Sequence, residues 1–358
     1  MESKPLPVAL IGAGGFGAMT LSALQRARGV KLVGLADRDG AVAAQAGAAA
    51  KVPFYTDNRS LLAETHPVAA FLCVPPMSAG DLLEECAQRG IHVWKEMPLA
   101  RSLAEAVGWV HVMDKAGLKF AVGTQRRFAI GYRSAAQWLS RLEKVFLART
   151  HYLFNWGPDL AWRADKAAAG GGALLELGYH AIDLLIWMLG LPEEVYAFSA
   201  GGHSQERQTI KGAPRDYDTD DTASALMRYS PDATAVVTTT RASGPVSEGL
   251  SLHGRMGSIT ASAESCLLRD PDGKTLDHLA DEAAPAEVFV RQVEAFATAV
   301  SAGSAQYECS GWENLLNHAV IEAMYLSDRT GQPENPERLL QTHKLPVAHC
   351  LRLRPAAI

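Results

Sequence analysis

Three titratable side chains recur at helical spacing near the middle of the chain. Glu176, His180 and Asp183 stand at positions i, i+4 and i+7 within the apolar stretch 173–189, so a helix there places all three on one face. A histidine held by a carboxylate one turn away transfers protons well near neutral pH. The spacing therefore predicts a site, centred on His180, that removes the proton of a substrate hydroxyl.

Other interpretations of these residues stay open at this point. A single histidine on a mostly apolar helix is more often a core residue whose hydrogen bonds are satisfied. The three side chains could also bind a metal, but their spacing matches no strong zinc signature, so we predict no metal site. Trp162 is more often a core or interface residue than a ligand contact, and Arg127 and Arg163 could form surface ion pairs.

Gly170, Gly171 and Gly172 open the predicted helix. Because glycine has no side chain, such an opening lets a ligand approach a helix N-terminus closely. We therefore expect a ligand to reach this end of the helix.

A second pattern lies near the start of the chain, where an apolar strand (8–11) leads through a glycine-rich turn into a helix (18–28). The turn consists of Gly12, Ala13, Gly14, Gly15, Phe16 and Gly17. In a βαβ unit of this kind, the first glycine allows a tight turn, the second lets a pyrophosphate approach the backbone, and the last lets helix and strand pack closely. The N–H groups and the dipole of the helix then bind phosphate. The pattern predicts a dinucleotide site.

The end of the next strand (31–36) bears on which dinucleotide binds. Asp37 lies about twenty residues past the glycines, where a carboxylate accepts hydrogen bonds from the adenosine ribose. A carboxylate repels a 2′-phosphate, which favours NAD over NADP. Arg38 weakens this inference, because a guanidinium could accommodate the phosphate or stack on adenine. We expect NAD, with NADP possible.

Helices and strands go on alternating up to residue 124. The run 69–74 is a continuous apolar strand, as suits a parallel strand buried on both faces. Pro75 follows at its carboxyl end, where ligands bind in open α/β sheets. Residues 1–124 are thus predicted to form an α/β Rossmann domain that binds NAD(P).

Residues 125–358 have a different pattern, in which strand-like segments follow one another with short turns. These segments cover residues 144–154, 194–200, 222–229, 234–241, 249–253 and 258–261. Helices return at 286–301 and 311–329. The order predicts an α+β domain for substrate binding and oligomerisation, with a large, mainly antiparallel open sheet. We expect residues 201–219, which are polar, to form a mobile loop.

Composition limits the classes of partner. The chain has 358 residues, a net charge of −5 and no cluster of lysine and arginine, which argues against nucleic acid or an anionic membrane as the main partner. No apolar run reaches membrane-spanning length, and the first strand leaves no room for a signal peptide. The 5 cysteines are scattered without a CxxC pair, as is typical of reduced thiols. We expect a cytoplasmic protein.

Together these segments resemble the Gfo/Idh/MocA family (glucose-fructose oxidoreductase, inositol dehydrogenase) from end to end. The motifs that carry the resemblance, in order, are the glycine loop at 12–17, Val74-Pro75-Pro76, and the segments 90–100, 122–128, 162–163, 170–183 and 254–259. The resemblance implies an N-terminal Rossmann domain and a C-terminal α/β domain whose open sheet forms homodimers or homotetramers. It also implies oxidation or reduction of sugars, polyols or their derivatives with NAD(P).

The resemblance assigns roles by position. His180 becomes the proton-transfer residue, and Glu176 stands where the family usually has an aspartate. Cofactor contacts beyond the glycine loop, Asp37 and Arg38 are then predicted at Val74, Pro75, Glu96, Met97, Pro98 and Gln125. Substrate contacts are predicted at Arg127, Trp162, Arg163 and Asp183.

One departure from the family concerns the chemistry itself. The lysine of the family's Glu-Lys-Pro motif, which lies by the nicotinamide and the substrate hydroxyl, is Met97 here, and methionine offers neither a proton nor a positive charge. Lys95 stands two residues earlier, on the same side of an extended segment. Either Lys95 or His180 alone then serves, or the chemistry is altered. Lys95 could equally be a packing or solvent lysine.

Three functions follow from these observations. The leading one is an NAD(P)-dependent oxidoreductase that acts on the CH–OH group of a sugar, polyol or sugar derivative. The second is an enzyme that uses tightly bound NAD as a recycled redox helper, as the family's glycosidases and transhydrogenases do. The third is a non-catalytic nucleotide- or sugar-sensing protein, which the loss of the lysine favours and the retention of His180 opposes. Nothing in the sequence selects one sugar.

Overall fold

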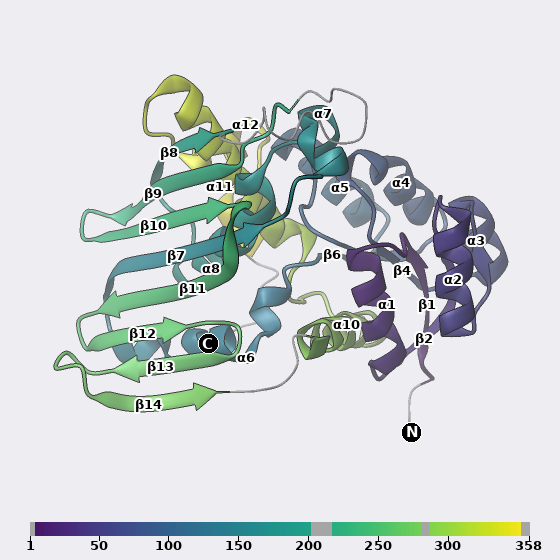
Figure 1. Ribbon diagram of the computed structural model, residues 1–358, viewed down its shortest axis with the longest axis horizontal. Helices are drawn as coiled ribbons and strands as arrows, with labels where there is room; N and C mark the ends of the chain where they lie inside the picture. Colours follow the sequence, from purple (N-terminus) through teal and green to yellow (C-terminus); the bar gives the residue numbers. More distant parts are fainter. Residues whose placement is uncertain (1–3, 202–216, 281–285, 352–358) are drawn as a thin grey trace.

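Two β-sheets, each with helices packed on it, make up the chain (Figure 1). The structure is a computed structural model that describes residues 4–201, 217–280 and 286–351. The first sheet has 6 strands in the order β3-β2-β1-β4-β5-β6, and the second has 8 in the order β14-β13-β12-β11-β7-β10-β9-β8. The expected Rossmann domain followed by an α+β domain is confirmed.

All neighbours in the first sheet pair in parallel. Its strands are β1 Leu6–Ile11, β2 Val30–Ala36, β3 Phe54–Tyr55, β4 Ala69–Leu72, β5 His92–Lys95 and β6 Phe120–Val122. Its helices are α1 Phe16–Arg26, α2 Gly40–Ala50, α3 Asn58–Thr65, α4 Gly80–Gln88 and α5 Leu103–Lys115. The chain order reverses between β1 and β4, and in doubly wound sheets ligands bind in the crevice at such a reversal.

The second sheet is mixed, because β7 and β10 pair in parallel while the other neighbours are antiparallel. Its strands are β7 Val145–Asn155, β8 Glu194–Ala200, β9 Thr222–Ser230, β10 Ala233–Thr240, β11 Ala242–Gly254, β12 Gly257–Ala261, β13 Ser265–Arg269 and β14 Thr275–Ala280. The sequence did not indicate β13, β14 or the first half of β11. That half of β11 is largely exposed and contains Gly244 and Pro245, so it lacks the alternation that marks a half-buried strand.

Helices α8 (Ala173–Leu189) and α11 (Gly311–Thr330) pack against the second sheet, with α6 (Ile130–Trp138) beside β12 and β13 (Figure 1). The remaining short elements are η1 Pro76–Ser78, η2 Gln125–Phe128, η3 Leu139–Leu142, η4 Ala161–Ala164, α7 Lys166–Ala169, α12 Pro336–Thr342 and α13 Val347–Leu351. Among the described residues, one stretch (166–189) has the length and composition of a membrane span, but 83% of its apolar window is buried. It is the core helix of this domain.

Helix α10 (Ala286–Ser301) returns from the second half of the chain to the first sheet, where it lies beside α1 (Figure 1). The ring of Phe296 stands edge-on to Phe71 of β4, with the ring centroids 5.8 Å apart. A domain boundary at residue 124 divides the sequence into two halves, but α10 of the second half packs on the sheet of the first. The boundary therefore stays a prediction. Most of the expected mobile loop at 201–219 lies outside the described residues.

Candidate active site

A cavity of about 1150 Å³ lies where the two sheets meet. The carboxyl ends of β1, β4 and β5 form one side of it, through the glycine loop, residues 73–76 and the segment 96–97. The other side comes from α8, η2, η4 and the strands β7 and β11. Each loop of the first sheet that lines the cavity was predicted to bind cofactor.

The glycine loop is packed at its ends and open in the middle. A Cβ on Gly12, whose φ is +87°, would lie 2.4 Å from the carbonyl oxygen of Cys73, and one on Gly17 would lie 2.0 Å from that of Gly12. No atom lies within 4 Å of a Cβ placed on Gly14. Helix α1 begins after Gly15 without a side-chain cap, and Gly14, Gly15 and Phe16 line the cavity. These features fit a pyrophosphate.

Asp37 lies next to this loop. Its Oδ2 accepts a hydrogen bond from the backbone N–H of Ala13 at 2.8 Å, and its Oδ1 accepts one from Asp39 at 2.9 Å. Arg38 is exposed. The carboxylate is therefore held at the end of β2, beside the glycine loop, as a ribose ligand would be.

The segment after β5 brings Glu96 and Met97 to the cavity but turns Lys95 away from it. Lys95 is fully buried, and its Nζ donates to the carbonyl oxygens of Glu96 and Pro98 at 2.9 and 2.7 Å. Burial lowers the pKa of Lys95 to about 8, against the opposing effect of the Glu96 carboxylate. The hypothesis that Lys95 takes part in catalysis is corrected: its ammonium group holds the backbone of this segment.

Two neighbouring arginines after β6 point in opposite directions. Arg126 lines the cavity, where its guanidinium donates to Glu248 at 2.7 Å and to the hydroxyl of Tyr152 at 2.9 Å. Arg127 is 1% exposed, and it pairs with Asp183 at 2.6 Å and with Glu313 at 3.0 Å. The short 3₁₀ turn η2 separates consecutive side chains widely. The expected substrate contacts at Arg127 and Asp183 are thus corrected, because these side chains form an ion pair in the interior.

His180 lines the cavity from α8 and is 7% exposed. Its Nδ1 has no hydrogen-bond partner among the described residues, and its ring lies 5.9 Å from that of Tyr152. Burial, and then the nearby cation of Arg126, lower the pKa of His180 well below its usual value. The imidazole is therefore neutral at physiological pH. The expectation that a carboxylate one turn away holds it is wrong.

Glu176 pairs instead with Arg163, and both side chains line the cavity. The Arg163 guanidinium lies over two indole rings, 4.1 Å from the centroid of Trp156 and 4.4 Å from that of Trp162. A guanidinium stacked on two rings and paired with a carboxylate has little freedom. Trp162 and Arg163, both predicted substrate contacts, thus belong to one rigid wall of the cavity.

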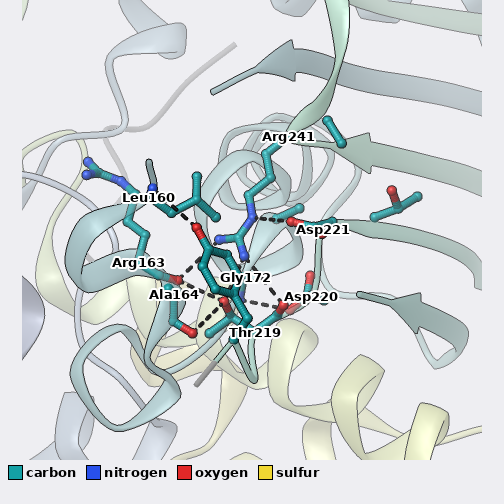
Figure 2. Close-up of polar contacts among 12 residues, drawn as sticks. Leu160, Arg163, Ala164, Gly172, Thr219, Asp220, Asp221 and Arg241 are labelled. Atoms are coloured by element: carbon teal, nitrogen blue, oxygen red, sulfur yellow. Dashed lines mark hydrogen bonds and ion pairs between the residues drawn. The ribbon is translucent and has the colours of Figure 1, made fainter. Parts of the chain in front are cut away.

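A buried polar cluster behind this wall fixes the backbone of η4 (Figure 2). Arg241 is fully buried, pairs with Asp221 at 3.0 Å, and donates to the Thr219 hydroxyl at 2.7 Å and to the Arg163 carbonyl at 3.3 Å. The Thr219 hydroxyl donates to that same carbonyl at 2.8 Å. Figure 2 shows the Arg163 side chain pointing away from this cluster, which therefore positions Arg163 through its backbone.

The glycines before α8 pack against protein and leave no room for a ligand. A Cβ would lie 2.5 Å from the backbone of Arg101 at Gly170, 2.4 Å from the Tyr325 hydroxyl at Gly171, and 1.9 Å from the Asp220 carbonyl at Gly172. The Asp220 carboxylate accepts from the N–H groups of Gly172 and Leu174, each at 2.8 Å (Figure 2). The expected approach of a ligand to this helix end is wrong, because Asp220 caps it.

Comparison with protein families agrees with this geometry. Residues 6–124 match the family model described as "Oxidoreductase family, NAD-binding Rossmann fold", and residues 132–260 match the "GFO/IDH/MocA C-terminal domain". The two models cover the two halves of one architecture, in the observed order. The chain belongs to the Gfo/Idh/MocA family.

Relatives of this Gfo/Idh/MocA protein include dehydrogenases that are similar over nearly their whole length. The D-xylose 1-dehydrogenase (NADP(+)) 2 of Haloferax volcanii is 26% identical over 90% of this chain and 97% of its own. The D-apiose dehydrogenase of Paraburkholderia graminis is 26% identical over 90% of this chain and 88% of its own. The crystal structure of an oxidoreductase domain protein from Kribbella flavida has the same fold, with a TM-score of 0.82 at 24% identity over 93% of this chain and 99% of that one. The chain is thus an NAD(P)-dependent dehydrogenase by family.

Several cavity residues of this Gfo/Idh/MocA protein were not predicted from its sequence. They are Arg126, Tyr152 and Glu248. Glu248 lies in the exposed first half of β11, which carries no strand signal, and Tyr152 could not be told from a core aromatic residue. The one sequence feature that pointed to these residues was the adjacent pair Arg126 and Arg127. It did not indicate which of the two side chains faces the cavity.

Proposed function

We propose that this protein oxidises the CH–OH group of an uncharged sugar or polyol with NAD(P). The observation that supports this most is a set of three buried polar atoms without a partner among the described residues, each in a residue that lines the cavity. They are Glu96 Oε2, Gln125 Oε1 and His180 Nδ1. Buried polar groups are almost always hydrogen-bonded, so a wall with three unused ones fits a ligand rich in hydroxyl groups. The names of the xylose and apiose dehydrogenases agree with such a ligand.

The charges in the cavity support an uncharged substrate. Arg126 is neutralised by Glu248, and Arg163 is neutralised by Glu176. An anionic sugar acid would have to displace one of these carboxylates or face it, and either would cost free energy. A hydroxyl group, by contrast, can donate to a carboxylate and accept from a guanidinium at once.

When bound, the cofactor would accept the two electrons of the reaction. The side chains of the cavity bind the cofactor and the substrate and orient the reacting hydroxyl. The glycine loop and the start of α1 bind the pyrophosphate, and Asp37 binds the adenosine ribose in NAD. On the substrate side, Arg163 and Trp162 hold the sugar. The neutral imidazole of His180 contacts the reacting hydroxyl and orients it.

We also infer that a second copy of the chain covers the open face of the second sheet. Leu226 of β9, which is 57% exposed, lies across from Tyr196 of β8 and Val236 of β10. Phe198 and Phe146 are exposed as well, at 60% and 50%. Such an apolar face is typical of an interface. Light scattering should give a dimer or larger, and the double variant Phe198→Ser/Leu226→Ser a monomer; a monomeric natural protein would contradict the inference.

The function is tested by mixing the purified protein with NAD or NADP and a panel of aldoses, polyols and sugar acids, and following the reduced cofactor. We expect turnover of an uncharged sugar or polyol, and slower turnover of the matching sugar acid. Turnover of none of them would contradict the proposal. Turnover without release of reduced cofactor would favour the recycled-cofactor alternative. The Met97→Lys variant is assayed in the same way, because Met97 has no ionisable side chain.

A further inference from the structure

Glu96 lines the cavity at the segment that follows β5. Glu96 is 7% exposed, and its Oε2 has no hydrogen-bond partner among the described residues. A Cβ placed on Gly123 would lie 2.8 Å from this oxygen, so the glycine at 123 leaves the space that the carboxyl fills. Glu96 is followed by Met97, which cannot itself accept or donate a proton.

The surroundings of Glu96 favour its protonated form. Burial raises its pKa to about 8, against the opposing effects of Lys95, the Met97 backbone N–H and Arg126. The Lys95 ammonium sits on backbone carbonyls, not on the carboxyl. At neutral pH this carboxyl therefore exchanges a proton readily.

The pKa of His180 is shifted in the opposite direction to that of Glu96. Glu96, His180 and Arg126 all line the same cavity, and the cation of Arg126 acts electrostatically on both of the other two groups. Burial lowers the pKa of the imidazole far below that of the Glu96 carboxyl. A proton released in this part of the cavity therefore binds to the carboxylate and not to the imidazole.

We propose that Glu96 accepts the proton of the reacting hydroxyl. This inference rests on the proposed function. In the balanced step, the substrate O–H bond breaks and its proton moves to the Glu96 carboxylate. The carbon loses its hydrogen together with two electrons to the oxidised cofactor, and the C=O bond forms. His180 then keeps the hydroxyl in position as a neutral hydrogen-bond partner.

Two readouts test the role of Glu96 in the natural protein, in Glu96→Gln and in the control Glu84→Gln, which changes an exposed glutamate of α4. The first is the infrared C=O band of a protonated carboxyl, followed between about pH 6 and about pH 9. We expect a band that disappears with a midpoint near pH 8 in the natural protein and the control and that is absent from Glu96→Gln.

The second readout is the pH profile of sugar oxidation. Turnover should rise as pH increases through about 8 and should fall at least about 100-fold in Glu96→Gln, while Glu84→Gln keeps the turnover of the natural protein. No titrating band, or full turnover in Glu96→Gln, would overturn the role of Glu96 and leave the proposed function standing. If the natural protein oxidises nothing on the panel, the proposed function fails, and the infrared titration then decides alone whether Glu96 holds an exchangeable proton.

Discussion

The carboxylate of Glu176 pairs with the guanidinium of Arg163, and neither it nor any other described group bonds to Nδ1 of His180, one turn along the same helix. The pair joins α8 to η4 and makes Glu176, the expected partner of His180, part of the cavity wall. Glu176 and His180 therefore lie at helical spacing on α8, but their side chains do not hydrogen-bond to each other. In the proposed mechanism the proton is therefore accepted by the segment after β5 and not by α8.

Replacing Arg163 by lysine should weaken substrate binding. Lysine keeps the charge but cannot stack on Trp156 and Trp162 at once, so the KM for the sugar should rise roughly tenfold, with a smaller change in kcat. Steady-state kinetics at saturating cofactor measures both. Arg149→Lys, at an exposed position of β7, is the matched control. An unchanged KM would mean that Arg163 does not contact the substrate.

Removing the carboxylate of Glu248 should change substrate charge preference. In Glu248→Gln the guanidinium of Arg126 loses its ionised partner inside the cavity. The ratio of kcat/KM for a sugar acid to that for the matching uncharged sugar should then rise about tenfold. The exposed Glu193→Gln should leave this ratio as it is. If Glu248→Gln also leaves it unchanged, the arginine–glutamate pair does not select against anions.

Asp37 should decide between the two cofactors. In Asp37→Ser the repulsion of the 2′-phosphate disappears, so the ratio of kcat/KM for NADP to that for NAD should rise roughly tenfold. Arg38→Ala should move the ratio the other way, since it removes a cation that a phosphate could meet. Initial rates with the two cofactors give the ratio. Equal ratios in all three proteins would show that neither side chain reads the ribose.

Gly172→Ala should destabilise the protein, while Gly108→Ala should not. A Cβ at Gly172 would lie 1.9 Å from the Asp220 carbonyl, whereas at Gly108, in the middle of α5, no described atom outside the neighbouring helix backbone lies within 4 Å. We expect a loss of about 2 kcal/mol or more in the free energy of unfolding at Gly172 and a gain of up to about 1 kcal/mol at Gly108. Urea unfolding measures both. Similar values would mean that the backbone at Gly172 moves aside freely.

His318 should make the protein less stable in acid. Its Nε2 accepts from the Ala100 N–H at 3.1 Å, and burial, then Lys95, lower the pKa of His318 from 6.5 to about 3. Between these two values the unfolded chain binds a proton that the folded chain does not, so stability falls as pH decreases through this window, by up to about 1.4 kcal/mol per pH unit. His318→Gln should flatten this slope, and the exposed His111→Gln should not. Identical slopes in urea unfolding series would contradict the assignment.

Local patterns were enough to predict much of this protein. The glycine loop, Asp37 and the alternation of helix and apolar strand depend on backbone conformation and on burial of neighbouring residues, which adjacent sequence determines. They predicted the first sheet, its order of elements and the cofactor loops that line the cavity. Most strands of the second sheet were predicted in the same way, because their buried positions alternate.

Tertiary structure alone decided which polar groups meet. Arg126 and Arg127 are adjacent and chemically identical, yet a 3₁₀ turn sends one to the cavity and the other to Asp183 and Glu313, which come from distant helices. Gly172 is small because Asp220, from a strand-to-strand segment far along the chain, lies against it. Which charges pair, and which carboxyl groups become buried, depends on residues that lie tens of positions apart in the sequence. Local spacing along the chain therefore cannot predict these contacts.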